Sequence, residues 1–217
     1  MRLKKEINLI KTICSIFSLG YLLISSASAQ ELDCSDKKKL SSQMICSSDF
    51  QQQKQKLETQ AITAHIVTDA PLRLLQDTQI IWLNQLKRCK SQVCYQQQFD
   101  GRIDQLNFFA SLNQSLTQHY LKVEDGYLLS KQPVHIQIHQ LSKNNIKIEG
   151  TAYLNPNNKS EKQTLSLLAY SSPDAKTEII NNNNDCKYSV KYTKSYITMK
   201  SLKKGCEPFN GIYRLYD

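Results

Sequence analysis

Cysteine and histidine are the residues of this chain whose types and spacing suit chemistry. The sequence has seven cysteines and four histidines, His65, His119, His135 and His139. No pair of cysteines has the Cys-x-x-Cys spacing of redox enzymes, and no histidine stands at zinc-ligand spacing from a cysteine. Redox catalysis and metal binding are therefore both disfavoured. We expect no cofactor.

His135 and His139 alternate with apolar residues and so are expected to be exposed on the polar face of a predicted strand. Four positions along a strand separate two rings by about 13 Å, too far to share a metal ion. The chain also has no Gly-x-Ser-x-Gly, no phosphate-binding loop and no His-Glu-x-x-His. We therefore expect no catalytic residue, and a protein that is not an enzyme.

Residues 1–29 have the three parts of a secretory signal peptide. Basic residues at 2, 4, 5 and 11 precede an apolar run over 12–24, and Ala27-Ser28-Ala29 offers small residues for cleavage. The apolar run is shorter than the roughly 20 residues of a membrane span. We expect an exported protein, periplasmic or secreted, with no transmembrane segment.

Cleavage removes Cys14 and leaves an even number of cysteines, which in an exported chain predicts disulfide bonds. Cys186 and Cys206 stand alone in the C-terminal half and most simply pair with each other. The other four allow three pairings, and the sequence does not choose between them. The six cysteines are Cys34, Cys46, Cys89, Cys94, Cys186 and Cys206.

The charge of the mature chain is moderately basic. Residues 1–29 contain four of the 28 basic and one of the 19 acidic residues, so the remainder carries 24 basic and 18 acidic residues and a net charge of +6. Lys37-Lys38-Lys39 is the only basic run, and it suits a solvated helix face. No basic patch is interleaved with aromatic residues, so we expect no nucleic-acid partner.

Helical spacing dominates the first half of the mature chain. Leu75, Gln79, Trp82, Leu86 and Cys89 recur at steps of three and four and predict a helix over 72–89 with the lone Trp at its centre. A second stripe predicts a helix from about Cys94 to about Tyr120. Two shorter helices are expected upstream, over 31–46 and from about 48, the second with a thin apolar face of Phe50, Leu57, Ala61 and Ile62 turned inward. Residues 30–122 then form a small helical bundle that needs disulfides to supplement its core.

Beyond Gly126 the apolar period changes to two. Alternating residues predict strands over 134–138, 146–154, 165–170, 186–192, 196–199 and 212–216, separated by segments rich in Asn, Pro, Ser and Gly. Residues 127–217 are therefore expected to form a small antiparallel sheet or open barrel. The fold class is α+β, with a disulfide-stapled helical bundle followed by this β domain.

Residues 33–106 resemble the N-terminal domain of the LprI family. The shared pattern is an early Cys, an Ile-Cys pair, Gln-x-x-Trp-Leu, two further cysteines, then an aromatic residue and Arg-Ile-x-x-Leu; besides the cysteines, the matching residues are Gln79, Trp82, Leu83, Phe99, Arg102, Ile103 and Leu106. Leu86-Lys87 replaces the usual Arg-Asp pair, and Gln53-Lys54 the usual Leu-Asp. The ending of the chain loosely resembles a β module found in some exported members.

The resemblance implies a lysozyme inhibitor with a protein partner. Such a protein must fill a cleft that contains two carboxylates, and a Lys, Ser or Tyr on a rigid loop suits that task. Candidate contacts are Lys194, Ser195, Tyr196, Lys203 and Lys204. Animal lysozymes are themselves generally basic, so net charge would not steer a +6 inhibitor to them.

The alternative is an accessory module that binds peptidoglycan, the anionic envelope or another envelope protein. A moderately basic, tyrosine-rich surface suits it. Tyr188, Tyr192 and Tyr196 form either an exposed stripe or half-buried packing.

Overall fold

The computed structural model describes residues 46–111, 113–129, 131–158 and 163–217, and these belong to one compact unit. The signal peptide expected over 1–29, Cys34 and nearly all of the helix expected over 31–46 lie outside the described residues. Within the described part of the chain, no helix has the length and apolar character needed to cross a membrane.

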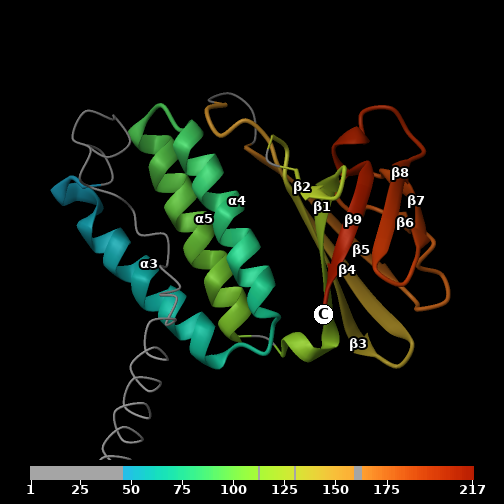
Figure 1. Ribbon diagram of the computed structural model, residues 1–217. Coiled ribbons are helices and arrows are strands. Elements are labelled where there is room, and N and C mark those ends of the chain that lie inside the picture. Colours follow the sequence, from blue (N-terminus) through green and yellow to red (C-terminus); the bar gives the residue numbers. More distant parts are fainter. Residues whose placement is uncertain (1–45, 112, 130, 159–162) are drawn as a thin grey trace, which may run out of the picture. The chain divides into compact units, whose positions relative to one another are not determined.

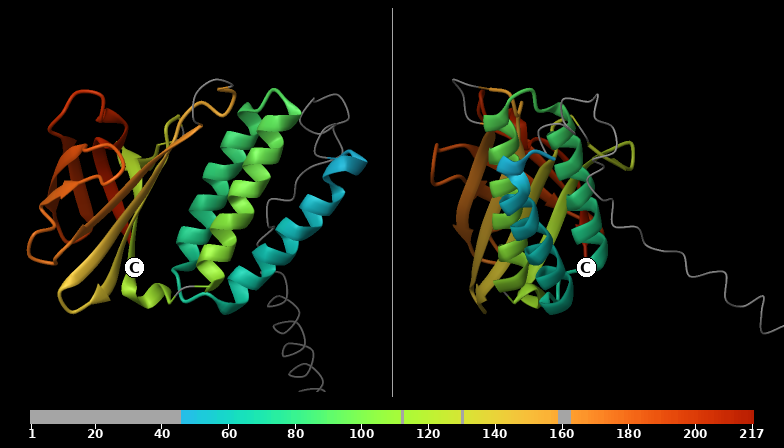
Figure 2. Two further views of the ribbon diagram at one scale, coloured as in Figure 1. Left: turned by 180° about the vertical axis from the view of Figure 1, so that it is seen from behind. Right: turned by 90° about the vertical axis from the view of Figure 1, so that its left-hand side faces the viewer.

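Three helices come first in the described chain: α3 (Ser48–Val67), α4 (Leu72–Arg88) and α5 (Gln92–Ser111) (Figure 1). Both α3 and α4 lie alongside α5, as the two further views also show (Figure 2). The expected thin apolar face of α3 is present, because only Phe50, Leu57 and Ala64 are buried there. Ile62, which was expected to face inward, is 62% exposed.

Aromatic rings make up the centre of the helical part. Trp82 is 5% exposed, meets Phe99 edge-on at 5.6 Å between ring centroids, and donates its Nε1 hydrogen to the Gln98 carbonyl oxygen at 2.8 Å. Phe50 of α3 packs on Phe99 at 5.7 Å. The predicted Trp helix and its buried stripe are therefore confirmed.

The predicted continuation of α5 to Tyr120 is wrong. The helix ends at Ser111, and after a short 3-10 helix, η2 (Gln114–Leu116), the chain becomes strand β1 (Thr117–Glu124). This strand begins within residues 30–122, the range expected to be helical. One of its faces, with Thr117, His119, Leu121 and Val123, is buried throughout, and two of these four side chains are polar, which weakens the polar–apolar alternation that marks a strand in a sequence.

The described residues form one nine-stranded antiparallel sheet, in the order β5-β4-β3-β1-β9-β8-β7-β6 with β2 beside β1. All six predicted strands are confirmed, while β1, β2 and β6 were not expected. After β1 the bounds are β2 (Tyr127–Leu128), β3 (Val134–Ser142), β4 (Asn145–Tyr153), β5 (Thr164–Ser171), β6 (Glu178–Ile180), β7 (Lys187–Tyr192), β8 (Tyr196–Ser201) and β9 (Gly211–Tyr216), with a second 3-10 helix, η3 (Glu207–Phe209), before β9.

The inner face of this sheet packs on an apolar core, and the outer face packs against helices. On the inner face, Tyr120, Ile136, Ile148, Leu167 and Tyr213 belong to one apolar core that also includes Phe209 of η3. On the outer face, Arg214 and Tyr216 of β9 contact Asp77 of α4. The helices therefore cover the outer face, and the α+β class is confirmed.

Asn181 brings the two end strands of the sheet together. It follows β6 and is fully buried; its Oδ1 accepts from the Leu168 amide of β5 at 3.1 Å, and its Nδ2 donates to the Ser166 carbonyl oxygen at 3.2 Å. The Asn182 amide donates to the Leu168 carbonyl oxygen at 2.8 Å. These bonds make the sheet a nearly closed barrel, in agreement with the expected open barrel.

The expected pairing of Cys186 with Cys206 is confirmed, with a Cα–Cα distance of 5.8 Å. Of the pairings that the sequence left open, the structure has Cys89 bonded to Cys94, with a Cα–Cα distance of 5.5 Å. Cys46 is also disulfide-bonded.

Candidate functional site

A cavity of about 670 Å³ with both polar and apolar lining lies between helices α4 and α5 and the outer face of strands β3, β4 and β5. Neutral amide and hydroxyl side chains line most of it. Exposed Gln97 and Gly101 of α5 lie at its edge, so the cavity reaches solvent there. Its lining residues are Thr78, Ile81, Trp82, Gln97, Gln98, Gly101, Arg102, Gln105, Phe108, His135, Gln137, Thr151, Tyr153, Asn158, Gln163 and Thr164.

Strand alternation places the polar side chains of the sheet in the cavity. Successive side chains of a strand point to opposite faces. In β4, Ile148 and Ala152 belong to the inner core, while Thr151 and Tyr153 line the cavity. In β3, Ile136 belongs to the core and its neighbour Gln137 lines the cavity. One alternating pattern therefore builds the core and the polar side of the cavity together.

Arg102 of α5 is the charged residue among these, and it is only 2% exposed. Its Nε donates to Gln79 Oε1 at 3.1 Å, and its Nη1 to Thr78 Oγ1 at 3.1 Å and Gln105 Oε1 at 2.5 Å. Its Nη2 lies 3.5 Å from the Leu75 carbonyl oxygen. All these acceptors are neutral. Burial lowers the pKa of Arg102 to about 10 because the cation loses hydration, so the side chain stays charged at neutral pH.

Among the described residues, Arg102 has no carboxylate partner. The ion pairs within the described ranges join Lys54 to Glu58, Lys147 to Glu149, and Asp77 to both Arg73 and Arg214. A buried cation without a counter-ion is costly unless hydrogen bonds compensate it. Arg102 therefore combines a structural role, joining α5 to α4, with a positive charge at the cavity.

The Tyr153 hydroxyl is the second notable group. Tyr153 is half-buried, lines the cavity and, in the described part of the chain, has no hydrogen-bond partner for its hydroxyl. Burial raises its pKa, and the charge of Arg102 acts in the opposite direction. The hydroxyl is therefore a neutral donor and acceptor that is left available at the cavity.

His135 was expected to be exposed, and this is wrong: it is 4% exposed. The outer face of β3 is covered by α5, so its polar alternation did not mean exposure to water. His135 Nε2 lies 3.2 Å from Nδ1 of His119, and Phe109 stacks beside both rings. His119 Nε2 in turn lies 2.9 Å from Gln114 Oε1.

Burial determines the protonation of the two histidines. It lowers the pKa of His119 to about 4, with His139 contributing, and lowers that of His135 well below its ordinary value, with the charges of His119 and Arg102 contributing. Both rings are therefore neutral at pH 7. Sequence reasoning missed the pair because His119 was placed in a helix.

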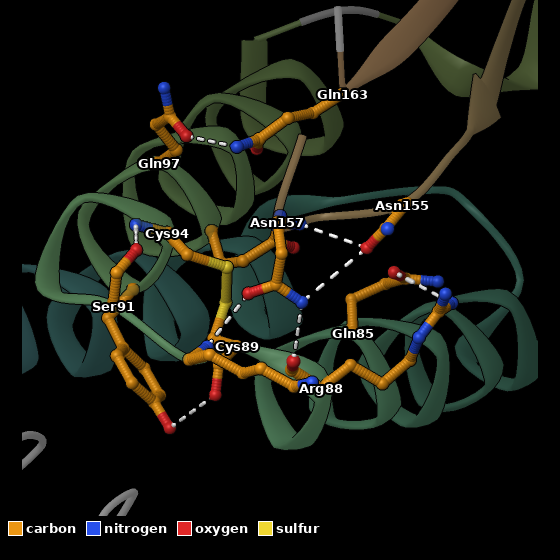
Figure 3. The surroundings of a disulfide bond; sticks show 12 residues. Gln85, Arg88, Cys89, Ser91, Cys94, Gln97, Asn155, Asn157 and Gln163 are labelled. Carbon is orange, nitrogen blue, oxygen red and sulfur yellow. Dashed lines mark hydrogen bonds between the residues drawn. A yellow bond between two sulfur atoms is a disulfide. The ribbon is translucent and has the colours of Figure 1, made fainter. Parts of the chain in front are cut away.

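The turn after β4 lies at one end of the cavity, next to the Cys89–Cys94 disulfide (Figure 3). The Asn157 side chain donates to the Arg88 carbonyl oxygen and accepts from the Lys90 amide, both at 2.8 Å. Gln163 donates to Gln97 of α5. The disulfide corner of the helices is thus attached to the sheet beside the cavity.

The described lining of the cavity offers hydrogen-bonding groups, the positive charge of Arg102 and apolar surface. Of its lining residues none is a carboxylate or a cysteine, and Trp82, Ile81 and Phe108 supply apolar surface. Elsewhere in the described ranges, no three His, Cys, Asp or Glu side chains come together at metal-binding distance. The arrangement suits a ligand rich in hydroxyl and amide groups.

The family-pattern residues come together around this site. Trp82 and Arg102 line the cavity, Gln79 accepts a hydrogen bond from Arg102, and Leu83, Phe99, Ile103 and Leu106 are buried between the helices. The sequence pattern located these residues but gave no sign of the cavity, because its other side comes from strands outside the pattern.

The candidate loop contacts are exposed but are not brought together. Lys194 and Ser195 lie between β7 and β8, with Tyr196 at the start of β8, whereas Lys203 and Lys204 follow the end of β8. A six-residue strand separates the two groups by roughly 17 Å. Tyr188 and Tyr192 pack at the inner core, so the exposed tyrosine stripe is wrong and the packing interpretation holds.

Comparison of the chain with protein-family models, with curated proteins and with solved structures gives no match.

Proposed function

We propose that this chain is an exported, non-catalytic binding protein that holds a hydroxyl- and amide-rich ligand of the cell envelope in the cavity between α4, α5 and the outer face of the sheet. The observation that carries the proposal is the lining: neutral polar side chains from five elements converge on one cavity of about 670 Å³, without a carboxylate or thiol for catalysis. Small-ligand sites commonly have this volume.

The ligand class follows from the groups that are present. Glutamine, asparagine, threonine and tyrosine side chains both donate and accept hydrogen bonds, which matches the hydroxyl and acetamido groups of envelope glycans. Trp82 adds aromatic surface to the cavity lining, against which a sugar ring can pack. The signal peptide expected over 1–29 would deliver the protein to the compartment of such glycans. The disulfide-stapled helical bundle, which includes the helix expected over 31–46, serves in this proposal as the scaffold of the binding site.

Gly101 allows a sharp test of the site. It lines the cavity, and a Cβ added there would meet no atom within 4 Å. Gly101→Trp should therefore fill the cavity without removing a hydrogen bond, while Gly101→Ala should leave it open. Soluble fragments released from isolated peptidoglycan by digestion are titrated into the mature protein in a calorimeter.

We expect binding by the wild type and by Gly101→Ala, and a loss of at least about tenfold in affinity for Gly101→Trp, the loss that corresponds to 1.4 kcal/mol. Circular dichroism checks that Gly101→Trp is folded. Absence of binding by the wild type would overturn the proposal. Equal binding by all three proteins would place the site elsewhere.

A second candidate is inhibition of a lysozyme-type glycan hydrolase, which the LprI resemblance implies. The observation in its favour is the turn between β7 and β8, where Lys194 and Ser195 are exposed and Tyr196 is 40% exposed. Such a turn can reach catalytic carboxylates by hydrogen bonding. The protein is added in molar excess to a turbidity-clearing assay with lysozyme. Slower clearing, relieved in a Lys194→Ala/Ser195→Ala variant, would support inhibition, and unchanged clearing would contradict it.

A further inference from the structure

We propose that the ligand of this cavity carries an anionic oxygen group, a carboxylate or a phosphate, that binds the Arg102 guanidinium with the Tyr153 hydroxyl as a second donor. The inference rests on the proposed function, because it names the chemistry of the ligand at the same site.

The positive charge of Arg102 is not balanced by a described carboxylate. Arg102 lines the cavity, is 2% exposed and forms no ion pair in the described part of the chain. Arg214, which links β9 to α4, has the carboxylate of Asp77 at 3.2 Å. Since an isolated buried cation is unfavourable, an anion that enters the cavity gains an attraction that water no longer screens fully.

The guanidinium of Arg102 is held in place by hydrogen bonds. Its Nε and Nη1 are held by side-chain oxygens of Gln79, Thr78 and Gln105, which fix the plane of the group. Nη2 has two hydrogens and one acceptor, the Leu75 carbonyl oxygen at 3.5 Å. At least one Nη2 hydrogen therefore has no acceptor among the described residues. A fixed guanidinium with a donor to spare is suited to an oxyanion.

The Tyr153 hydroxyl is the second donor that the cavity offers to the ligand. It lines the same cavity from β4, and among the described residues it neither donates nor accepts a hydrogen bond. Arg102 lines the same cavity from α5, and its charge acts on the pKa of Tyr153. Together they supply two donors and one positive charge to the cavity. The other described lining residues carry no charge at neutral pH, so Arg102 is the place where an anionic group would bind.

The test uses three probes built on one sugar. N-acetylglucosamine is neutral, N-acetylmuramic acid adds a carboxylate, and N-acetylglucosamine 6-phosphate adds a phosphate. Each is titrated calorimetrically into the mature protein and into Arg102→Gln, Arg102→Lys and Tyr153→Phe. The charge-matched control is Lys87→Gln, an exposed position on α4 away from the cavity lining.

We expect at least one anionic probe to bind the wild type about tenfold or more tightly than the neutral sugar, because a hydrogen bond to a charged group contributes about 1.5–3 kcal/mol, roughly 10- to 150-fold. The anionic probe that binds more tightly shows whether the anionic group of the ligand is a carboxylate or a phosphate. Arg102→Gln should abolish the preference, Arg102→Lys should restore part of it, and Lys87→Gln should change nothing. Tyr153→Phe, which removes no hydrogen bond to a described residue, should weaken only the anionic probes.

Two outcomes separate this inference from the function on which it rests. If anionic and neutral probes bind the wild type alike, or if peptidoglycan fragments bind Arg102→Gln and Tyr153→Phe as they bind the wild type, the anion site is overturned and the cavity function stands. If no probe and no fragment binds the wild type, both are overturned. Should Arg102→Gln fail to fold, Tyr153→Phe still decides.

Discussion

Gly101 is a residue whose local environment predicts a gain in stability. It lies inside α5, and its missing side chain leaves space, since a Cβ there meets nothing within 4 Å. Glycine in a helix interior is less favourable than alanine by roughly 0.5–1 kcal/mol because the unfolded chain gains more freedom. We expect Gly101→Ala to raise the free energy of unfolding by about that amount in urea titration.

The matched control for Gly101 is Gly126. A Cβ at Gly126 also meets nothing within 4 Å, but its φ is +82°, a conformation that alanine disfavours. Gly126→Ala should therefore lower stability by about 1 kcal/mol. If both substitutions stabilised the protein, available space alone would explain the effect and the backbone account would be contradicted.

The His119–His135 pair predicts a stability that falls in acid. Burial lowers the pKa of His119 from 6.5 to about 4, so the unfolded state binds its proton first as the pH drops. The contribution of His119 is complete above pH 6.5 and is lost progressively between pH 6.5 and about 4. At pH 5 the expected loss from His119 alone is about 2 kcal/mol relative to pH 7.5.

Urea titrations between pH 7.5 and 5 measure this loss, and the variant His119→Gln isolates it. Groups outside the pair whose charges act on its rings include His139, which acts on His119, and Arg102, which acts on His135. Since the other titrating groups are common to both proteins, the difference in slope reports on His119. Parallel pH profiles for the wild type and the variant would show that the pair does not titrate as its burial predicts.

At the scale of single residues, the sequence predicted burial where apolar spacing was regular. Leu75, Trp82 and Leu86 recur at helical steps and are all buried. It failed for His135, because an alternating strand shows which residues share a face but not what covers that face. The covering helix, α5, comes from a distant part of the sequence, so the polar cavity depends on a tertiary contact that no local pattern encodes.

The boundary between α5 and β1 is where element prediction failed. Phe108, Phe109 and Leu116 continue the helical spacing, yet the helix ends at Ser111. Asp69, in the connection between α3 and α4, accepts hydrogen bonds from the Gln114 and Ser115 amides at 2.7 and 3.1 Å. This contact over more than forty positions holds the chain where it leaves the helix, so the local period alone was insufficient.

The attachment of the turn after β4 to the helix corner predicts a specific loss of stability. Asn157 pairs with the Arg88 carbonyl oxygen and the Lys90 amide (Figure 3). Because each hydrogen bond contributes about 0.5–1.5 kcal/mol, Asn157→Ala should lower the free energy of unfolding by about 1–3 kcal/mol. Hydrogen exchange should show that the Lys90 amide loses protection.

The adjacent Asn158 provides the control for this element. No side-chain hydrogen bond of Asn158 exists within the described residues, although its backbone amide donates to the Asn155 carbonyl oxygen. Asn158→Ala should therefore leave unfolding and Lys90 exchange nearly unchanged. Equal effects at both positions would mean that the turn, and not the Asn157 amide, determines the attachment.

On the scale of the whole molecule, one sheet separates two environments. Its inner face is closed around an apolar core by the β5–β6 contact at Asn181, and its outer face carries the polar groups that meet α4 and α5. The change of period near Gly126 predicted that helices and strands would be separate. The change of period did not reveal that the helices and the sheet share the cavity. The helical spacing and the strand alternation each describe one part of the chain and contain no signal of contact between the two parts.

The two described disulfides constrain the whole chain unequally. Cys186–Cys206 spans 20 positions and Cys89–Cys94 spans five. In the chain-entropy account, closing the longer loop restricts the unfolded state more, with about 3 kcal/mol expected for the longer bridge and about 2 kcal/mol for the shorter. Replacing each pair by alanines should therefore lower stability more for the β-sheet bridge.

Urea titration of the two double variants compares these losses, and thiol titration of the native mature protein should find no free thiol because all six cysteines are expected to be paired. A larger loss for Cys89→Ala/Cys94→Ala would contradict the loop-length account. It would mean that the short bridge acts mainly in the folded state, by holding the corner where Asn157 attaches the sheet to the helices.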